Sequence, residues 1–118
     1  MSASFEDLKV WQRSCALTIK IYKLLKNWKD FGLKDQILRA AVSIASNIAE
    51  GSERKSAADF SRFLDIAKGS AAELRTQIYI AQQVDLLGSE ESSDMISELK
   101  EISRMLQGLS MSLSKSGN

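Results

Sequence analysis

Few residues of this chain could do chemistry. Its 118 residues include one cysteine, Cys15, and no histidine. Without histidine there is no Ser-His or Cys-His dyad, no imidazole base and no histidine-containing metal site. Cys15 falls within an apolar stripe, which is typical of a buried structural thiol. We therefore predict that the protein is not an enzyme, and that it has no catalytic residue, no cofactor and no metal.

Two groups of cations could instead bind an anion. One group lies on a single face of the first predicted helix, and the other precedes the third predicted helix, whose free backbone N–H groups favour anions. The candidate residues for binding RNA, DNA or another anion are Lys9, Arg13, Lys20, Lys23, Arg54 and Lys55. So few cations predict weak, salt-dependent phosphate binding that an oligomer would multiply. An ordinary solvated basic face and a polar loop are the alternative.

A third group is a possible polar lock between the second and third predicted helices. A buried charge needs a partner, so Arg39 or Arg62 could pair with Glu50 or Glu73 across this contact. The proposed lock consists of Arg39, Asn47, Glu50, Arg62 and Glu73. The same residues could instead form a ligand site.

The elements that position these residues are helices. Apolar residues recur at helical spacing, no run alternates as a strand would, and proline is absent. Breaks containing glycine predict four helices, over about residues 5–29, 33–50, 56–87 and 92–113. Ser56 is the expected cap of the third helix, and Ser92 or Ser93 that of the fourth. Short connections then predict an all-α, up-down-up-down antiparallel four-helix bundle that forms one domain over residues 1–118.

The first two predicted helices have unusually wide apolar arcs. Each carries two apolar stripes, whereas a helix of an isolated bundle needs only one. Because monomers seldom expose large apolar patches, the second stripe predicts a homo-oligomer. The expected interface residues are Val10, Leu17, Ile21, Leu24, Trp28, Leu38, Val42 and Ala45. The alternative is that both stripes are buried within one irregular bundle.

Charge and targeting signals predict a cytoplasmic protein that does not enter a membrane. The net charge is +1, with a balance of +4 over residues 1–55 and −3 over residues 56–118. The start of the chain lacks the basic and apolar regions of a signal peptide. The two longest uncharged stretches, residues 40–49 and 105–114, are far shorter than the roughly 18 residues that a membrane span needs.

Several runs of the chain resemble a known family. They include Phe5-Glu6-Asp7-Leu8-Lys9-Val10-Trp11-Gln12, Ser46-Asn47-Ile48-Ala49-Glu50-Gly51 and Ala67-Lys68-Gly69-Ser70. Over about residues 5–110 the chain resembles bacterial four-helix-bundle proteins encoded within 23S ribosomal RNA intervening sequences. The resemblance implies a homopentamer without established enzymatic activity. A related branch, the accessory proteins of diversity-generating retroelements, is more basic and binds nucleic acid and a reverse transcriptase.

Two functions are therefore open. The first is a homo-oligomeric, non-enzymatic module that contacts RNA or DNA through the basic strip of the first helix. The alternative is a structural scaffold that recruits a protein partner and does not contact nucleic acid.

Overall fold

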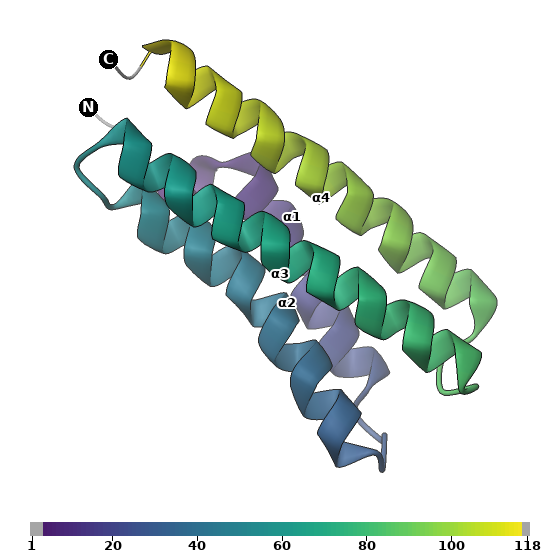
Figure 1. The fold of residues 1–118 in the computed structure, drawn as a ribbon. Helices are drawn as coiled ribbons and strands as arrows, with labels where there is room; N and C mark the ends of the chain where they lie inside the picture. Colours follow the sequence, from purple (N-terminus) through teal and green to yellow (C-terminus); the bar gives the residue numbers. More distant parts are fainter. Residues whose placement is uncertain (1–3, 117–118) are drawn as a thin grey trace.

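A computed structural model describes residues 4–116, which form four α-helices preceded by one short 3₁₀ turn (Figure 1). The elements are η1 (Phe5–Asp7), α1 (Lys9–Leu24), α2 (Phe31–Ser52), α3 (Ala57–Gln83) and α4 (Ser89–Ser116). Each helix packs against its neighbours in the sequence, and α4 returns to lie beside α1. Consecutive helices run in opposite directions along a molecule of 48 × 20 × 19 Å. The predicted all-α, antiparallel four-helix bundle is confirmed.

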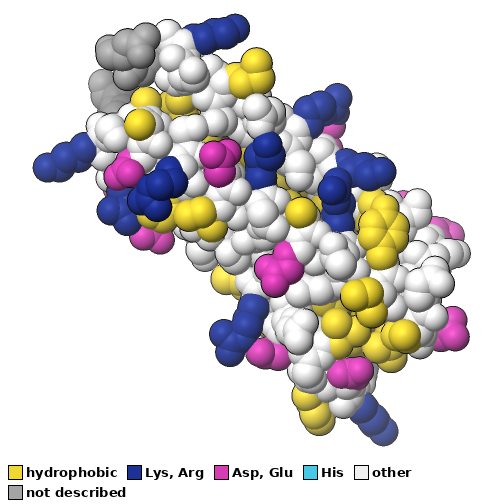
Figure 2. Space-filling view, viewed as in Figure 1, with side chains coloured by type: hydrophobic (Ala, Val, Ile, Leu, Met, Phe, Trp, Pro, Cys, Tyr) yellow, Lys and Arg dark blue, Asp and Glu magenta, His cyan; other side chains and the backbone are white. Residues whose placement is uncertain are grey.

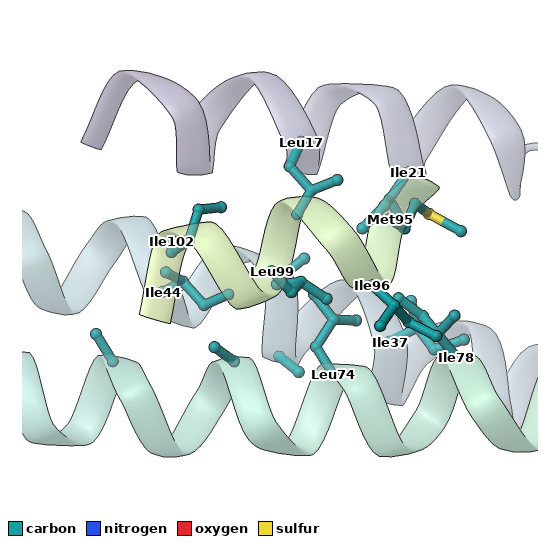
Figure 3. Close-up of a cluster of buried hydrophobic side chains, with 14 of the residues drawn as sticks. Leu17, Ile21, Ile37, Ile44, Leu74, Ile78, Met95, Ile96, Leu99 and Ile102 are labelled. Atoms are coloured by element: carbon teal, nitrogen blue, oxygen red, sulfur yellow. The ribbon is translucent and has the colours of Figure 1, made fainter. Parts of the chain in front are cut away.

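All four helices contribute apolar side chains to one continuous core (Figure 3). Leu17 and Ile21 of α1 face the interior together with side chains such as Ile44 of α2, Leu74 of α3 and Leu99 of α4. Burial of these aliphatic side chains is the main force that holds the bundle together, since each contributes about 1.5–3 kcal/mol. No helix within residues 4–116 has both the length and the apolar composition that a membrane span requires.

The first predicted helix is shorter than expected. Residues 5–7 form the separate turn η1, because Leu8 has an extended backbone with φ −77° and ψ 123°. The helix then ends at Leu24 instead of residue 29. The side chain of Asp30 accepts a hydrogen bond from the Leu33 N–H at 3.1 Å, so α2 begins at Phe31 and the chain must turn before it.

The boundary between α3 and α4 also differs from the prediction. The Ser56 hydroxyl caps α3 as expected and accepts a hydrogen bond from the Asp59 N–H at 3.0 Å. At the other end, Asp85 has φ 63°, the left-handed conformation that ends a helix, so α3 ends at Gln83. The predicted cap at Ser92 or Ser93 is wrong, because α4 begins at Ser89 and Ser92 is a fully buried residue of its first turns.

Part of the predicted oligomer interface is wrong as well. Val10, Leu17 and Ile21 are at most 5% exposed in the single chain, because they form the stripe of α1 that faces its own core. Leu24, Trp28 and Leu38 are half-buried against the same core. Val42 and Ala45 of α2 do remain accessible, and they border a surface that the other apolar stripe of α1 forms.

Candidate functional site

The most distinctive surface of the molecule is an apolar groove between α1 and α2, with a volume of about 390 Å³. Its walls come from η1, α1 and α2. The residues that line it are Phe5, Trp11, Cys15, Thr18, Ile19, Val42, Ala45, Ser46 and Ala49. We call this surface the α1/α2 groove.

The groove exists because α1 presents one apolar stripe to the core and a second to solvent. On the solvent side, Ile19 is 55% exposed and Tyr22, which follows it on the helix, is 50% exposed. On α2, Val42 is 41% exposed. Small residues such as Ala45, Ser46 and Ala49 leave the space between the helices open, whereas larger side chains would fill it.

The floor and one end of the groove are held by specific contacts. The Thr18 hydroxyl donates to the Ser14 carbonyl oxygen at 2.8 Å and lies 3.2 Å from the Ala41 carbonyl oxygen of α2. At the end formed by η1, the rings of Phe5 and Trp11 meet edge to face with their centroids 5.2 Å apart. The groove is therefore a preformed part of the bundle.

Cys15 lies in the wall of this groove and is half-buried instead of fully buried as predicted. Burial raises the pKa of its thiol, because the apolar surroundings disfavour the thiolate. A thiol that stays protonated is a weak nucleophile, so Cys15 contributes apolar surface to the groove.

The basic strip on α1 lies beside acidic residues of α4. Arg13 donates two hydrogen bonds to the Glu98 carboxylate, at 2.9 and 2.6 Å. The hydrogen bond from Arg13 lowers the pKa of Glu98, and the same contact raises the pKa of Arg13. Lys20 lines the same hollow as Asp94 and Glu98. One of the four predicted phosphate-binding cations of α1 is thus already paired.

The remaining predicted cations fall into two groups. Lys9, Lys20, Lys23 and Lys55 are exposed and form no ion pair within residues 4–116. Arg54 is paired with Glu50 at 2.8 Å, and its guanidinium also lies 4.7 Å from the centre of the Phe63 ring. The hollow next to Arg54 and Lys55 is also lined by Glu53 and Asp59, so its charge is mixed.

The predicted charge lock between α2 and α3 is wrong. Arg39 pairs with Asp35 within α2 at 2.7 Å, and Arg62 lies 3.4 Å from Asp59 within α3. Glu73 is exposed and has no ion-pair partner in the described part of the chain. Arg39 and Arg62 find partners one helical turn away, because the surface of each helix supplies them without desolvation.

A smaller, neutral polar contact joins α2 to α3 instead. The Ser43 and Ser70 hydroxyls share a hydrogen bond of 2.8 Å, and the Asn47 side-chain amide donates to the Ser43 hydroxyl at 2.9 Å. Asn47 is thus the one predicted lock residue that belongs to an inter-helix polar cluster. Nearby, Gly51 lets the helices approach closely, because a Cβ there would lie 2.6 Å from the Phe63 Cβ.

The apolar stripe that contains Cys15 also includes Trp11, Ile19 and Tyr22, and the sequence analysis did not predict that this stripe forms an open surface. The two stripes of α1 have the same spacing, so periodicity alone does not show which faces the core. Ser14, which lies in the buried stripe and donates to the Val10 carbonyl oxygen at 2.7 Å, makes that stripe look less apolar than it is.

Within residues 4–116, no group of three or more His, Cys, Asp or Glu side chains could hold a metal ion.

Solved structures of other proteins share this fold. No curated protein matches the chain significantly. A crystal structure of a protein of unknown function from the S23 ribosomal protein family of Bacteroides thetaiotaomicron VPI-5482 is similar, with a TM-score of 0.80 and 28% identity. The similarity covers 86% of this chain and 97% of that one. The model of the 23S rRNA-intervening sequence protein family matches residues 6–108. The chain therefore belongs to the 23S rRNA-intervening sequence protein family.

Proposed function

We propose that the protein is a non-enzymatic, self-assembling module of the cytoplasm whose α1/α2 groove is covered by another copy of the chain. The observation that carries this proposal is the exposure of Ile19 and Val42 in the wall of a groove with almost no polar lining. Tyr22, three residues beyond Ile19 on α1, is exposed as well. Apolar surface of this kind gains free energy when a partner removes it from water. The family resemblance points to five copies.

Measurement of the solution mass tests this proposal. We expect light scattering at micromolar concentration to give a mass several times the 13.1 kDa of one chain. Ile19→Asp places a charge in the groove, so it should shift the population to monomers. The matched control is Ile66→Asp, which alters an isoleucine that is 41% exposed on α3, outside the groove. A wild-type mass of 13 kDa at every concentration would refute the proposal.

A second candidate function is binding of RNA or DNA by the assembled module. The observation that favours it is that α1 carries four cations and no acidic residue, and that Lys9, Lys20 and Lys23 form no ion pair within residues 4–116. Repetition of these lysines in several subunits would multiply a weak attraction to phosphates. The proximity of Asp94 and Glu98 to Lys20 opposes it.

Fluorescence anisotropy tests this second function with a labelled single-stranded RNA and a labelled DNA duplex. We expect binding at low salt that weakens steeply as salt is added. Combined replacement of Lys9, Lys20 and Lys23 by Gln should abolish it. Replacement of Lys68, Lys100 and Lys115 by Gln, on α3 and α4, is the charge-matched control. Absence of binding at low salt would exclude nucleic acid and leave a scaffold that recruits a protein partner.

A further inference from the structure

The connection from α1 to α2 forms a protruding tip at one end of the bundle. We call residues 23–34, which span this connection, the basic tip. Its charged residues are four lysines and one aspartate, namely Lys23, Lys26, Lys29, Lys34 and Asp30. Figure 2 shows hydrophobic and basic side chains together at the lower end of the molecule, where Figure 1 places this connection. The tip thus combines a local excess of positive charge with exposed apolar surface.

The apolar part of the tip is the ring of Phe31. Among the large hydrophobic side chains within residues 4–116, it is the most exposed, at 72%. Phe31 is the first residue of α2, and it lines neither the α1/α2 groove nor the hollows beside Arg13 and Arg54. Because the ring protrudes, a partner that receives it must either be soft or have a matching pocket.

Hydrogen bonds within the tip hold it in shape. The Asp30 side chain accepts a hydrogen bond from the Leu33 N–H at 3.1 Å, and Lys34 Nζ donates to the Lys26 carbonyl oxygen at 3.2 Å. The acidic side chain of the tip is therefore engaged in capping α2. Lys26 and Lys29 are exposed and form no ion pair in the described part of the chain. Their charges are available to an anionic partner.

Other charged residues near this end of the bundle leave the charge of the tip in place. Asp35, on the first turns of α2, pairs with Arg39 at 2.7 Å. The acidic residues around the α3–α4 connection lie at a separate corner of this end (Figure 1), and they are Asp85, Glu90 and Glu91. Lys20 is not part of the tip, because it lines a hollow together with acidic residues of α4.

A protruding aromatic ring beside several lysines fits the surface of an anionic lipid bilayer. Aromatic side chains settle at the boundary between headgroups and acyl chains, and lysines next to that boundary are attracted to anionic headgroups. A single-stranded nucleic acid is bound best by a groove, in which bases stack while the backbone follows the cations. The tip is convex instead, so its shape favours a bilayer.

We propose that the basic tip docks the protein on an anionic membrane surface, with Phe31 inserted among the headgroups and Lys26 and Lys29 beside lipid phosphates. Such a contact lies on the membrane surface and requires no membrane-spanning helix. It uses no residue that lines the α1/α2 groove, so it goes beyond the proposed self-assembly. Because one tip offers a single ring and few cations, each copy binds weakly, and several tips on one assembly bind more tightly.

Flotation with lipid vesicles tests the proposal. We expect the wild type to float at low salt with vesicles of phosphatidylglycerol and phosphatidylcholine, and to stay in solution with vesicles of phosphatidylcholine alone. Phe31→Ser should weaken binding about tenfold or more, because the burial of the ring is lost. Lys26→Gln combined with Lys29→Gln should also weaken it about tenfold or more, because two charges no longer attract the anionic surface.

Two sets of matched variants serve as controls. Ile66→Ser removes an apolar side chain that is 41% exposed on α3, outside the tip. Lys55→Gln combined with Lys115→Gln removes two exposed cations at the opposite end of the bundle. Both should bind vesicles like the wild type. Circular dichroism must show that each variant is folded, and Phe31→Ala replaces Phe31→Ser if that variant is not.

Three outcomes would overturn the membrane contact. The first is a wild type that does not float with anionic vesicles at low salt. The second is an equal loss of binding in the tip variants and the controls, which would indicate an attraction shared by any exposed cation. The third is a set of tip variants that bind labelled RNA or DNA more weakly but float unchanged, which would make nucleic acid the partner. Self-assembly is measured separately, by the solution mass.

Discussion

At the scale of single residues, small side chains decide how closely the helices of this bundle pack. Gly51 is buried near the end of α2, and an added Cβ would lie 2.6 Å from the Phe63 Cβ and 3.0 Å from a ring carbon of Phe60. Gly69, in the middle of α3, has no heavy atom within 4 Å of such a Cβ. The same residue type thus has a steric role at one position and none at the other.

This difference leads to a paired prediction. Gly51→Ala should lower the free energy of unfolding by about 1–3 kcal/mol, because the contact between α2 and α3 must open to admit the methyl group. Gly69→Ala should raise it by up to about 1 kcal/mol, because alanine is the better helix former and has open space there. Urea unfolding measures both changes. An equal response at the two positions would contradict the close approach at Gly51.

Ser92 gives a second residue-scale prediction. Its hydroxyl is fully buried and has no hydrogen-bond partner within residues 4–116. Ser92→Ala should therefore stabilise the protein by about 1 kcal/mol, because it removes an unpaired polar group from the core. Ser14→Ala is the control, since the buried Ser14 hydroxyl donates to the Val10 carbonyl oxygen and its removal should bring a smaller gain. Thermal unfolding measures both, and a loss of stability in Ser92→Ala would contradict the prediction.

At the scale of the elements, α1 is the shortest helix and is tied to α4 by a single ion pair. Arg13 and Glu98 form the one ion pair between different helices in the described part of the chain, since the other four lie within helices or one turn beyond α2. Both side chains are partly exposed, so water screens the attraction. The pair therefore helps to orient α1, while Val10, Leu17 and Ile21 supply most of its stability.

The lowered pKa of Glu98 predicts a pH dependence. The Glu98 carboxyl has a lower pKa in the folded state than in the unfolded state. The ion pair therefore stabilises the protein above about pH 4.5, and this contribution is lost as the pH falls through the folded pKa. Glu98→Gln should cost less than about 1 kcal/mol at pH 7 and less still at pH 3. Urea unfolding at the two pH values checks this. Glu73→Gln, at an exposed and unpaired position, should match the wild type at both.

At the scale of the whole molecule, the exposed apolar surfaces are what the proposed self-assembly would cover. Its core is closed, yet large apolar side chains remain in water in the α1/α2 groove and at the end of α3, where Tyr79, Ile80, Val84 and Leu86 are exposed. A partner that covers them binds the folded chain and not the unfolded one. Association should therefore stabilise the fold by mass action.

A dependence of the melting temperature on protein concentration follows. Between 1 and 100 μM the wild type should melt at progressively higher temperature, with a total rise of several degrees. The Ile19→Asp variant, which we expect to be a monomer, should melt at one temperature throughout. Differential scanning calorimetry measures both. A wild-type melting temperature that does not change over this range would argue against coupling between assembly and folding.

Much of the fold follows from local patterns. The spacing of apolar residues predicted all four helices, and Ser56 marked the start of α3, because helical periodicity and capping depend on residues within a few positions of each other. The boundaries at Leu8 and Asp85 were missed, since each depends on a backbone conformation that leucine and aspartate do not require. The ion pairs were misassigned because Arg39 and Arg62 had acidic neighbours within their own helices.

The sequence alone showed that α1 and α2 have more apolar surface than one seam of a bundle uses. It did not show which stripe would remain outside, because Val10, Leu17 and Ile21 repeat with the same period as Trp11, Cys15 and Ile19. Tertiary packing made that choice, because the contacts of α1 with α2 and α4 bury the first stripe and leave the second in the groove wall. The direction in which a helix faces depends on neighbours distant in the chain, and no local pattern contains it.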